Sequence, residues 1–225
     1  MSNSERQSIL AALADAQWLS GFARGLAENL VQEGSIVRLD AGVWAHGEGD
    51  EATGLIVVAE GALNLFCEIS KDREVLVGHA PAGVTIGQTV SFGGGPRLVT
   101  AISVAPSLVL KVSDAALGRV ARKRPEIWRA LARLAYFQLS VALRVNAELI
   151  GLPPRAKLAS RLLMLAGPRN AHIVLSQHAL AEMIGLSRKT VNVYLRGFET
   201  AGLVRTVYGG LDLTDRRALA KIAAG

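Results

Sequence analysis

Hydrophobic positions change their spacing along the chain and divide it into three zones. The first zone, residues 5–32, carries large apolar residues at roughly helical intervals, which predicts short helices. From about residue 34 to residue 112, short β-branched runs such as SIVRL and EVLVGHA alternate with turns that contain Gly, Asp and Pro. Many short strands at near-regular spacing predict an antiparallel barrel or jelly roll.

The third zone is mainly helical and begins at Ser113-Asp114, a pair suited to a helix N-cap. Pro125-Glu126 suits the first turn of a long helix that runs to about Ile150. Apolar residues and one glutamine recur in this helix at alternating intervals of four and three, the seam of a coiled coil. We expect the seam to form a homodimer interface. Packing against the chain's own barrel is the alternative, and both can occur together. The seam residues are Ile127, Leu131, Leu134, Gln138, Val141 and Val145.

The last part of the chain has the pattern of a winged helix-turn-helix. Gly151-Leu152-Pro153-Pro154 ends the long helix and is the expected hinge. Ser176 then caps a short helix, Gly185 suits a tight turn, and Ser187 caps a second helix. Residues 205–213, with two glycines at the turn, predict a hairpin beside the second helix. This order of elements is typical of a DNA-binding motif.

The second helix separates a packing face from a polar face. Val191, Leu195 and Phe198 fall on one side and dock the helix, whereas cations, hydroxyls and a carboxamide fall on the other. Guanidinium and carboxamide groups can pair with base edges in the major groove, while hydroxyls and helix N-termini bind phosphate. Lysine and arginine add charge neutralisation. We predict that double-stranded DNA is contacted by Ser176, Gln177, Ser187, Arg188, Lys189, Thr190, Asn192 and Arg196.

The chain has a net charge of +6, and the excess of positive charge lies in its last third. Residues 152–225 carry 11 Lys and Arg against four Asp and Glu, whereas residues 1–151 carry 14 against 15. A neutral module joined to a basic one indicates that the second module meets a polyanion. A solvated basic surface with no role in nucleic-acid binding would give the same count.

The segment GLSRKTVNVYLRGFETAGLV resembles the recognition-helix segment of the cyclic-AMP receptor and fumarate–nitrate regulator family of bacterial transcription factors. The resemblance covers nearly the whole chain and implies an α+β fold. Its parts would be a β jelly-roll sensor domain with N-terminal helices (residues 1–113), a dimerisation helix region (114–151) and a winged helix-turn-helix (152–225).

The family resemblance implies a homodimeric, non-enzymatic regulator that binds two-fold DNA sites, with RNA polymerase as a further possible partner. Arg188 would be the main base-reading residue. Lys189 stands where the family often has an acidic residue, and Val193 stands where it often has a second arginine. The DNA half-site should therefore differ from that of the cyclic-AMP receptor itself.

Residues 81–101, PAGVTIGQTVSFGGGPRLVTA, resemble the family's phosphate-binding cassette, in which a Gly-Glu pair precedes a helical turn and an arginine follows. Here Gln88 replaces the glutamate, so the charge-assisted hydrogen bond to a ribose hydroxyl is lost. A cyclic nucleotide, another small effector and a barrel without ligand all stay open, as does Arg97 as an ordinary surface cation. The expected effector-pocket residues are Gly87, Gln88, Thr89 and Arg97, with Ala142 and Leu143 from the long helix.

A cupin-like metalloenzyme is the alternative from another class, because the same jelly roll hosts such sites. His46, Glu48 or Glu51, and His79 would be its ligands. A working site needs three or four converging ligands, and the paired-histidine spacing is missing, so we predict no metal.

Two features of the sequence concern the compartment and the cysteine chemistry. The single cysteine, Cys67, excludes a disulfide framework and an iron–sulfur site within one chain. The polar N-terminus and the lack of an apolar run of roughly 18 residues favour a cytoplasmic protein without membrane contact.

Overall fold

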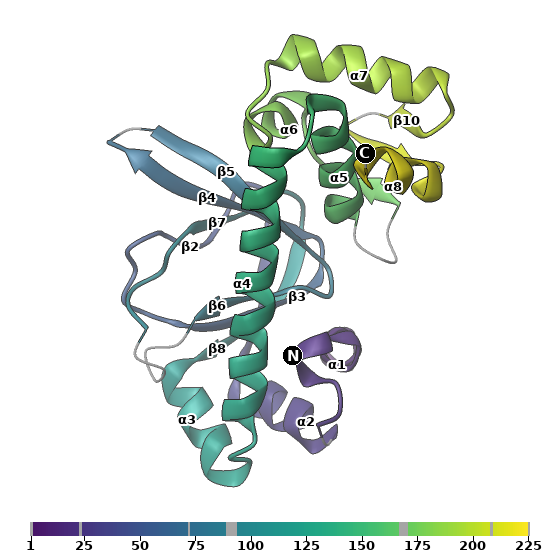
Figure 1. Cartoon of the computed structure of the whole chain (residues 1–225). Coiled ribbons are helices and arrows are strands. Elements are labelled where there is room, and N and C mark those ends of the chain that lie inside the picture. The colour runs from purple at the N-terminus through teal and green to yellow at the C-terminus, as the bar shows by residue number, and fades with distance from the viewer. Residues whose placement is uncertain are drawn as a thin grey trace. The chain divides into compact units, whose positions relative to one another are not determined.

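The computed structural model describes residues 2–22, 24–71, 73–88, 94–166, 171–207 and 209–224. The chain forms two compact units, Met1–Ser140 and Val141–Gly225 (Figure 1). The boundary between them lies inside the long helix α4 (Ile127–Gly151). The division of the chain into three segments at residues 113 and 151 stays a prediction.

Two antiparallel four-stranded sheets form the barrel of the first unit, in the orders β1-β8-β3-β6 and β2-β7-β4-β5. The expected antiparallel barrel is therefore confirmed. A turn at Gly61, whose φ is +76°, separates two long strands, β3 and β4. The strands are β1 (Ser35–Leu39), β2 (Trp44–His46), β3 (Gly54–Glu60), β4 (Ala62–Ser70), β5 (Arg73–Pro81), β6 (Thr85–Gln88), β7 (Thr100–Ser103) and β8 (Ser107–Ser113).

Alternate side chains of β3 belong to two different hydrophobic cores. Leu55 and Val57 belong to a core shared with the helices, whereas Ile56 and Val58 belong to the interior of the barrel. Successive side chains of a strand point to opposite faces, so both faces of this strand are buried. The helices that supply the outer core are α1 (Asn3–Asp15), η1 (Gln17–Leu19), α2 (Arg24–Glu33), α3 (Asp114–Lys123) and the start of α4.

The N-terminal half of α4 is part of this outer core. Ile127, Leu131 and Leu134 are 0%, 3% and 6% exposed and pack among the helices and β-strands of their own chain. The alternative of packing within the chain therefore holds for these three residues, and their part in a dimer seam stays a prediction. Gln138 also turns to its own chain, where its Nε2 atom donates a hydrogen bond of 3.4 Å to the carbonyl oxygen of Thr85.

Beyond Leu134 the same helix exposes large apolar side chains. Val141 is half exposed and Val145 is partly exposed, so these two seam residues are open to a partner. A helix that is apolar around much of its surface is stable in water only when another surface covers it. The exposed large apolar residues of this stretch are Tyr136, Phe137, Leu139, Val141, Leu143 and Ile150.

The second unit packs helices around a small antiparallel sheet of order β10-β11-β9. Its helices are capped where the sequence predicted: the Ser176 hydroxyl accepts from the amide of Ala179, and the Ser187 hydroxyl accepts from the amide of Thr190. The elements are α5 (Pro154–Ala166), β9 (His172–Ile173), α6 (Gln177–Met183), α7 (Arg188–Thr200), β10 (Val204–Val207), β11 (Gly210–Leu213) and α8 (Arg216–Ala224).

The break between α4 and α5 is braced by side chains. The Ser160 hydroxyl donates a hydrogen bond of 2.6 Å to the carboxylate of Glu148, which lies one turn before the break. Arg161, only 3% exposed, follows in α5; burial lowers its pKa, and the charge of Glu148 opposes that shift. The segment 151–154, predicted as a hinge, therefore joins two helices that are also held together by contacts within one unit.

Thr85 offers a test of how the N-terminal helices are attached to the barrel. Its hydroxyl accepts a buried hydrogen bond of 3.0 Å from the indole Nε1 of Trp18. Replacing Thr85 by Val keeps the shape but leaves that N–H group unpaired, so we expect a loss of about 1–3 kcal/mol in the free energy of unfolding. Urea unfolding measures this, with Thr85→Ser as the matched control that keeps the hydroxyl. A valine variant as stable as the serine variant would contradict the expectation.

Candidate DNA interface and effector pocket

Helix α7 presents a cationic face because its opposite face is buried. Val191, Leu195 and Phe198 are at most 3% exposed, as the sequence predicted. Arg188, Lys189 and Arg196 are exposed, and Thr190 and Asn192 are partly exposed. The backbone of Gly185, with φ of +64°, makes the tight turn that brings α6 to α7. The structure thus gathers the predicted DNA-contacting residues of α7 on its solvent side.

The capping hydroxyls at the start of α7 are already engaged within the protein. Besides accepting from the Thr190 amide, the Ser187 hydroxyl lies 2.8 Å from the Thr190 hydroxyl. Each hydroxyl oxygen has two lone pairs and one proton, so the pair can still meet a phosphate oxygen while it caps the helix. Ser176 is exposed and Gln177 is partly exposed at the corresponding end of α6.

A row of polar and charged residues crosses the wing, and sequence reasoning missed it. Arg205, Asp212 and His172 are register partners on β10, β11 and β9. The Asp212 carboxylate accepts from Arg205 Nη2 and lies against His172 Nδ1, both at 2.8 Å. Arg205, followed by His172, holds the pKa of the Asp212 carboxyl below its usual range. The row fixes the side chain of Arg205 to the sheet.

The wing is also attached to α7. The carboxylate of Glu199 accepts a hydrogen bond of 2.9 Å from the backbone amide of Thr206, and the amide of Leu203 donates 2.8 Å to the carbonyl oxygen of Phe198. These two hydrogen bonds hold the hairpin against the C-terminal end of α7.

In the barrel, the structure brings two of the predicted pocket residues together. Gly87 has φ of +113°, and a Cβ atom placed on it would lie 2.8 Å from Arg97 Nη1. Arg97 is only 7% exposed and donates to the carbonyl oxygens of Ala52 and Gly54 at 3.2 and 2.7 Å. Arg97 is therefore not an ordinary surface cation.

The burial of Arg97 disfavours the charged form of its guanidinium group. Burial lowers the pKa of the guanidinium, while the carboxylates of Asp114 and Asp50 favour the charged form. A second cation, Lys111, lies close enough to be affected by Arg97, and its ammonium donates a hydrogen bond of 2.7 Å to the carbonyl oxygen of Ala45.

The remaining pocket residues are only partly described. The backbone of Gln88 ends β6, and Thr89 lies outside the described residues. Ala142 and Leu143 are exposed on the part of α4 that belongs to the second unit. Their place in an effector pocket stays a prediction.

The histidines of the barrel do not form a metal site. His46 on β2 and His79 on β5 are at opposite edges of one sheet, three strand spacings or roughly 14 Å apart. Burial lowers the pKa of both imidazoles to about 4, with the charge of Arg97 adding to the effect on His46. His79 Nδ1 is 2.8 Å from the amide oxygen of Asn64. Across the described ranges, no three His, Cys, Asp or Glu side chains converge as metal ligands.

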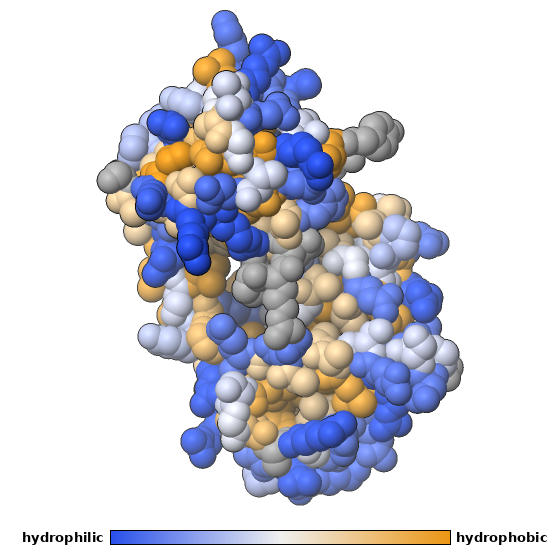
Figure 2. Space-filling model, turned by 90° about the vertical axis from the view of Figure 1, so that its right-hand side faces the viewer, coloured by the Kyte–Doolittle hydropathy of each residue, from blue (hydrophilic) through white to orange (hydrophobic). Residues whose placement is uncertain are grey.

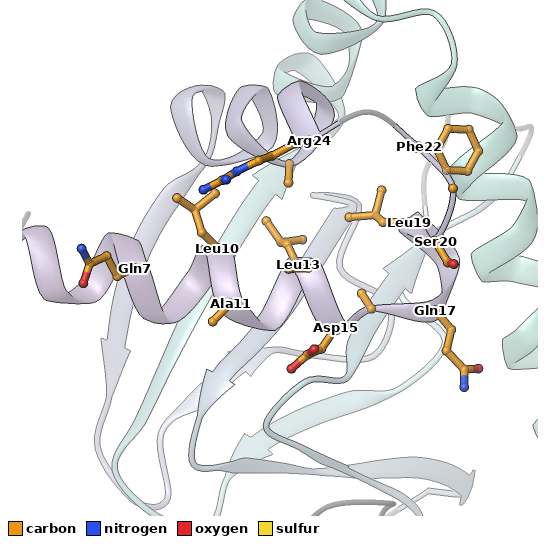
Figure 3. A pocket seen from close by; sticks show the side chains of 14 residues that line it. Gln7, Leu10, Ala11, Leu13, Asp15, Gln17, Leu19, Ser20, Phe22 and Arg24 are labelled. Atoms are coloured by element: carbon orange, nitrogen blue, oxygen red, sulfur yellow. The ribbon is translucent and has the colours of Figure 1, made fainter.

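The first unit also contains a hollow of about 870 Å³ between α1, η1 and α2. Figure 3 shows Leu10, Leu13 and Leu19 between these helices, with Gln7 and Gln17 at the two ends of the hollow. On the face of the molecule in Figure 2, apolar surface is exposed between polar side chains. The hollow offers mainly apolar contact, and we assign it no ligand.

No helix among the described residues combines the length and the apolar character that a membrane span requires.

Two family models match the chain on either side of the long helix. Residues 36–124 match the cyclic nucleotide-binding domain, and residues 156–222 match the Crp-like helix-turn-helix domain. Together with the capped, cationic α7, these matches define a DNA-binding transcription regulator that carries a sensor-type barrel, not an enzyme. The chain belongs to the cyclic-AMP receptor and fumarate–nitrate regulator (CRP/FNR) family. The cupin-like alternative was wrong.

Relatives over most of the chain include the nitrogen fixation regulation protein FixK of Bradyrhizobium diazoefficiens, at 28% identity over 85% of this chain and 83% of the relative. A CRP-like cAMP-activated global transcriptional regulator of Mycobacterium tuberculosis is 26% identical over 78% of this chain and 82% of its own.

Solved structures share the fold. FixK2 from Bradyrhizobium japonicum superposes with a TM-score of 0.74 at 19% identity, covering 85% of this chain and 98% of that one. The c-di-GMP responsive global regulator CLP of Xanthomonas campestris has a TM-score of 0.67 at 20% identity, covering 86% and 100%.

Proposed function

We propose that the protein is a homodimeric, sequence-specific regulator in which α7 enters the major groove at each half of a two-fold DNA site. One observation carries this proposal: the exposed face of α7 holds Arg188, Lys189 and Arg196, and the buried face fixes its direction. A helix of this kind is how helix-turn-helix proteins reach base edges. Since its target is chromosomal DNA, we place it in the bacterial cytoplasm.

Each polar group of α7 has a role that follows from its chemistry. Arg188, at the first position of the helix, offers two parallel donors to guanine O6 and N7. Asn192, one turn on, can pair with adenine or reach a phosphate. Lys189 and Arg196 neutralise phosphates, and the Ser187–Thr190 pair binds the backbone together with the N-terminus of the helix. Both activation through RNA polymerase and repression by occlusion are open to such a dimer.

The second half of α4 supplies the proposed dimer contact. Its exposed apolar residues start where the helix leaves the core of its own domain, after Leu134. A second copy of the same helix would cover them in an isologous pair, the commonest form of homodimer. Such a pair would also set the separation of the two copies of α7.

The barrel is the proposed effector site, with Gly87 and Arg97 at its centre. One relative is named as cAMP-activated and one protein of the same fold as c-di-GMP responsive, so regulators with this fold respond to different nucleotides. Here Arg97 donates two hydrogen bonds to backbone carbonyls, and Gln88 lacks the charge that a ribose hydroxyl would meet. These departures favour an effector other than cyclic AMP, or a barrel that acts without one.

An effector would act through a two-state equilibrium, and only by binding the two states with different affinity. The hydrogen bond from Gln138 to Thr85 connects α4 directly to β6, the strand that carries Gly87. A shift of β6 would therefore displace the dimer helix α4 through this hydrogen bond.

Arg188→Ala tests the proposed recognition role. We expect a ten- to hundred-fold loss of affinity per half-site for a selected operator, because a bidentate arginine–guanine pair contributes about 1–3 kcal/mol of discrimination. Binding to unrelated DNA should fall much less. Fluorescence anisotropy at fixed salt measures both, with Arg122→Ala on the exposed face of α3 as control. An equal loss on both DNAs would show that Arg188 contacts only phosphate.

Val141→Glu tests the proposed dimer. A carboxylate on the exposed apolar part of α4 would be buried unpaired in a helix pair, so the variant should be monomeric at concentrations where the native protein is dimeric. Sedimentation equilibrium distinguishes the two states. Leu98→Glu is the matched control, because Leu98 is 68% exposed but lies in a loop outside the helix. Dimerisation unaffected by Val141→Glu would place the interface elsewhere.

Gln88→Glu tests the pocket with cyclic AMP as the probe. A carboxylate accepts a stronger hydrogen bond from the ribose hydroxyl than a carboxamide does, so calorimetry should show about five-fold tighter binding of cyclic AMP. Gln7→Glu, which adds the same charge at an exposed position of α1, should leave the titration unchanged. If the Gln88 variant binds no better than the native protein, the cassette is not used in the predicted way.

A further inference from the structure

Val193 is an exposed aliphatic side chain in the middle of the cationic face of α7. It is 62% exposed, whereas the other large aliphatic side chains of the helix, Val191 and Leu195, are buried. At 3.6 residues per turn, Val193 lies nearly opposite Val191 and next to Lys189 and Arg196, which are one turn before and after it. The residue therefore points away from its own domain, at the centre of the proposed DNA-facing surface.

The local structure of α7 does not require valine at this position. Valine is a weaker helix former than alanine, leucine or lysine, because its branched side chain loses rotamer freedom against the preceding turn. A solvent-exposed position in the middle of a helix gives it no packing in return. An aliphatic side chain placed among cations gains buried apolar area only against a partner that is itself apolar at that point.

The major groove of DNA offers one such group. Base edges there present hydrogen-bond donors and acceptors, except for the C5-methyl group of thymine. An isopropyl group set against a polar base edge would remove water from that edge without replacing its hydrogen bonds, which is unfavourable. Set against a thymine methyl group, it buries apolar surface on both sides.

We propose that Val193 reads the 5-methyl group of one thymine in each half-site of the operator. This inference rests on the proposed role of α7 as the recognition helix and adds a specificity determinant to it. Arg188 at the start of the helix would select a guanine, and Val193 would select a thymine at a separate base pair of the same half-site.

Uracil substitution in an operator selected with the native dimer tests the inference. Uracil keeps every hydrogen-bonding group of thymine and lacks only the methyl group. Each thymine of the half-site is replaced in turn, symmetrically in both halves, and binding is measured by anisotropy at fixed salt. We expect one position at which uracil weakens binding about four-fold per half-site, or roughly fifteen-fold for the dimer, as burial of one methyl group implies.

The Val193→Ala variant tests whether Val193 is the residue that contacts the methyl group at the uracil-sensitive position. The variant should bind the thymine and uracil operators equally at that position and retain its preference at the base pair read by Arg188. Because the position is exposed and alanine favours helix, the variant should fold normally, which circular dichroism verifies. Val174→Ala, a change at another exposed valine of the same unit, should keep the uracil sensitivity of the native protein. When cytosine replaces this thymine, methylation of the cytosine at C5 should strengthen operator binding by the native protein. The same methylation should leave operator binding by Val193→Ala unchanged.

Two results would overturn the inference: no thymine whose replacement by uracil weakens native binding, or a uracil effect that Val193→Ala leaves unchanged. The Arg188→Ala variant separates these from failure of the proposed function. If Arg188→Ala loses specific binding while uracil has no effect, α7 is the recognition helix and only the role of Val193 fails. If Arg188→Ala keeps specific binding, the assignment of α7 itself fails.

Discussion

The burial of Val191, Leu195 and Phe198 decides which side of α7 faces solvent, and the rest of the DNA-binding unit depends on that choice. The three residues lie on one stripe, so they fix rotation about the helix axis as well as position. The wing follows from the same packing, since Leu203 and Thr206 are hydrogen-bonded to Phe198 and Glu199 at the end of α7. Without the buried stripe, a cluster of cations would have no defined direction.

Features with a local signal could be predicted from the sequence. The caps at Ser176 and Ser187 and the positive φ of Gly185 are set by the residues themselves and their immediate neighbours. The apolar stripe of α7 is periodic, so the pattern specifies which side chains are buried, and the continuous apolar run of β3 fits a strand that is buried on both faces. A pattern does not specify what covers them. In α4 the four-three spacing fits a partner helix and an intramolecular core equally well. In the structure, Ile127, Leu131 and Leu134 are buried in the intramolecular core.

In the candidate pocket, contacts between residues far apart in the chain could not be predicted from the sequence. Gly87 and Arg97 could be paired from a family pattern, and the structure brings them together. The burial of Arg97 had no such signal, because the carbonyl oxygens that satisfy its guanidinium belong to Ala52 and Gly54, more than forty residues earlier. The row of Arg205, Asp212 and His172 is similar, since it depends on the register of three strands. Contacts of this kind arise only once the sheet has formed.

Thr85 has a consequence for how such a regulator changes over evolutionary time. Its side chain accepts the indole of Trp18 and its backbone carbonyl accepts the amide of Gln138, so one strand residue serves two helices through two different atoms. The backbone contact does not depend on which residue occupies position 85. Substitutions of side chains in the barrel, position 85 included, can therefore accumulate while the hydrogen bond that attaches this strand to the long helix survives.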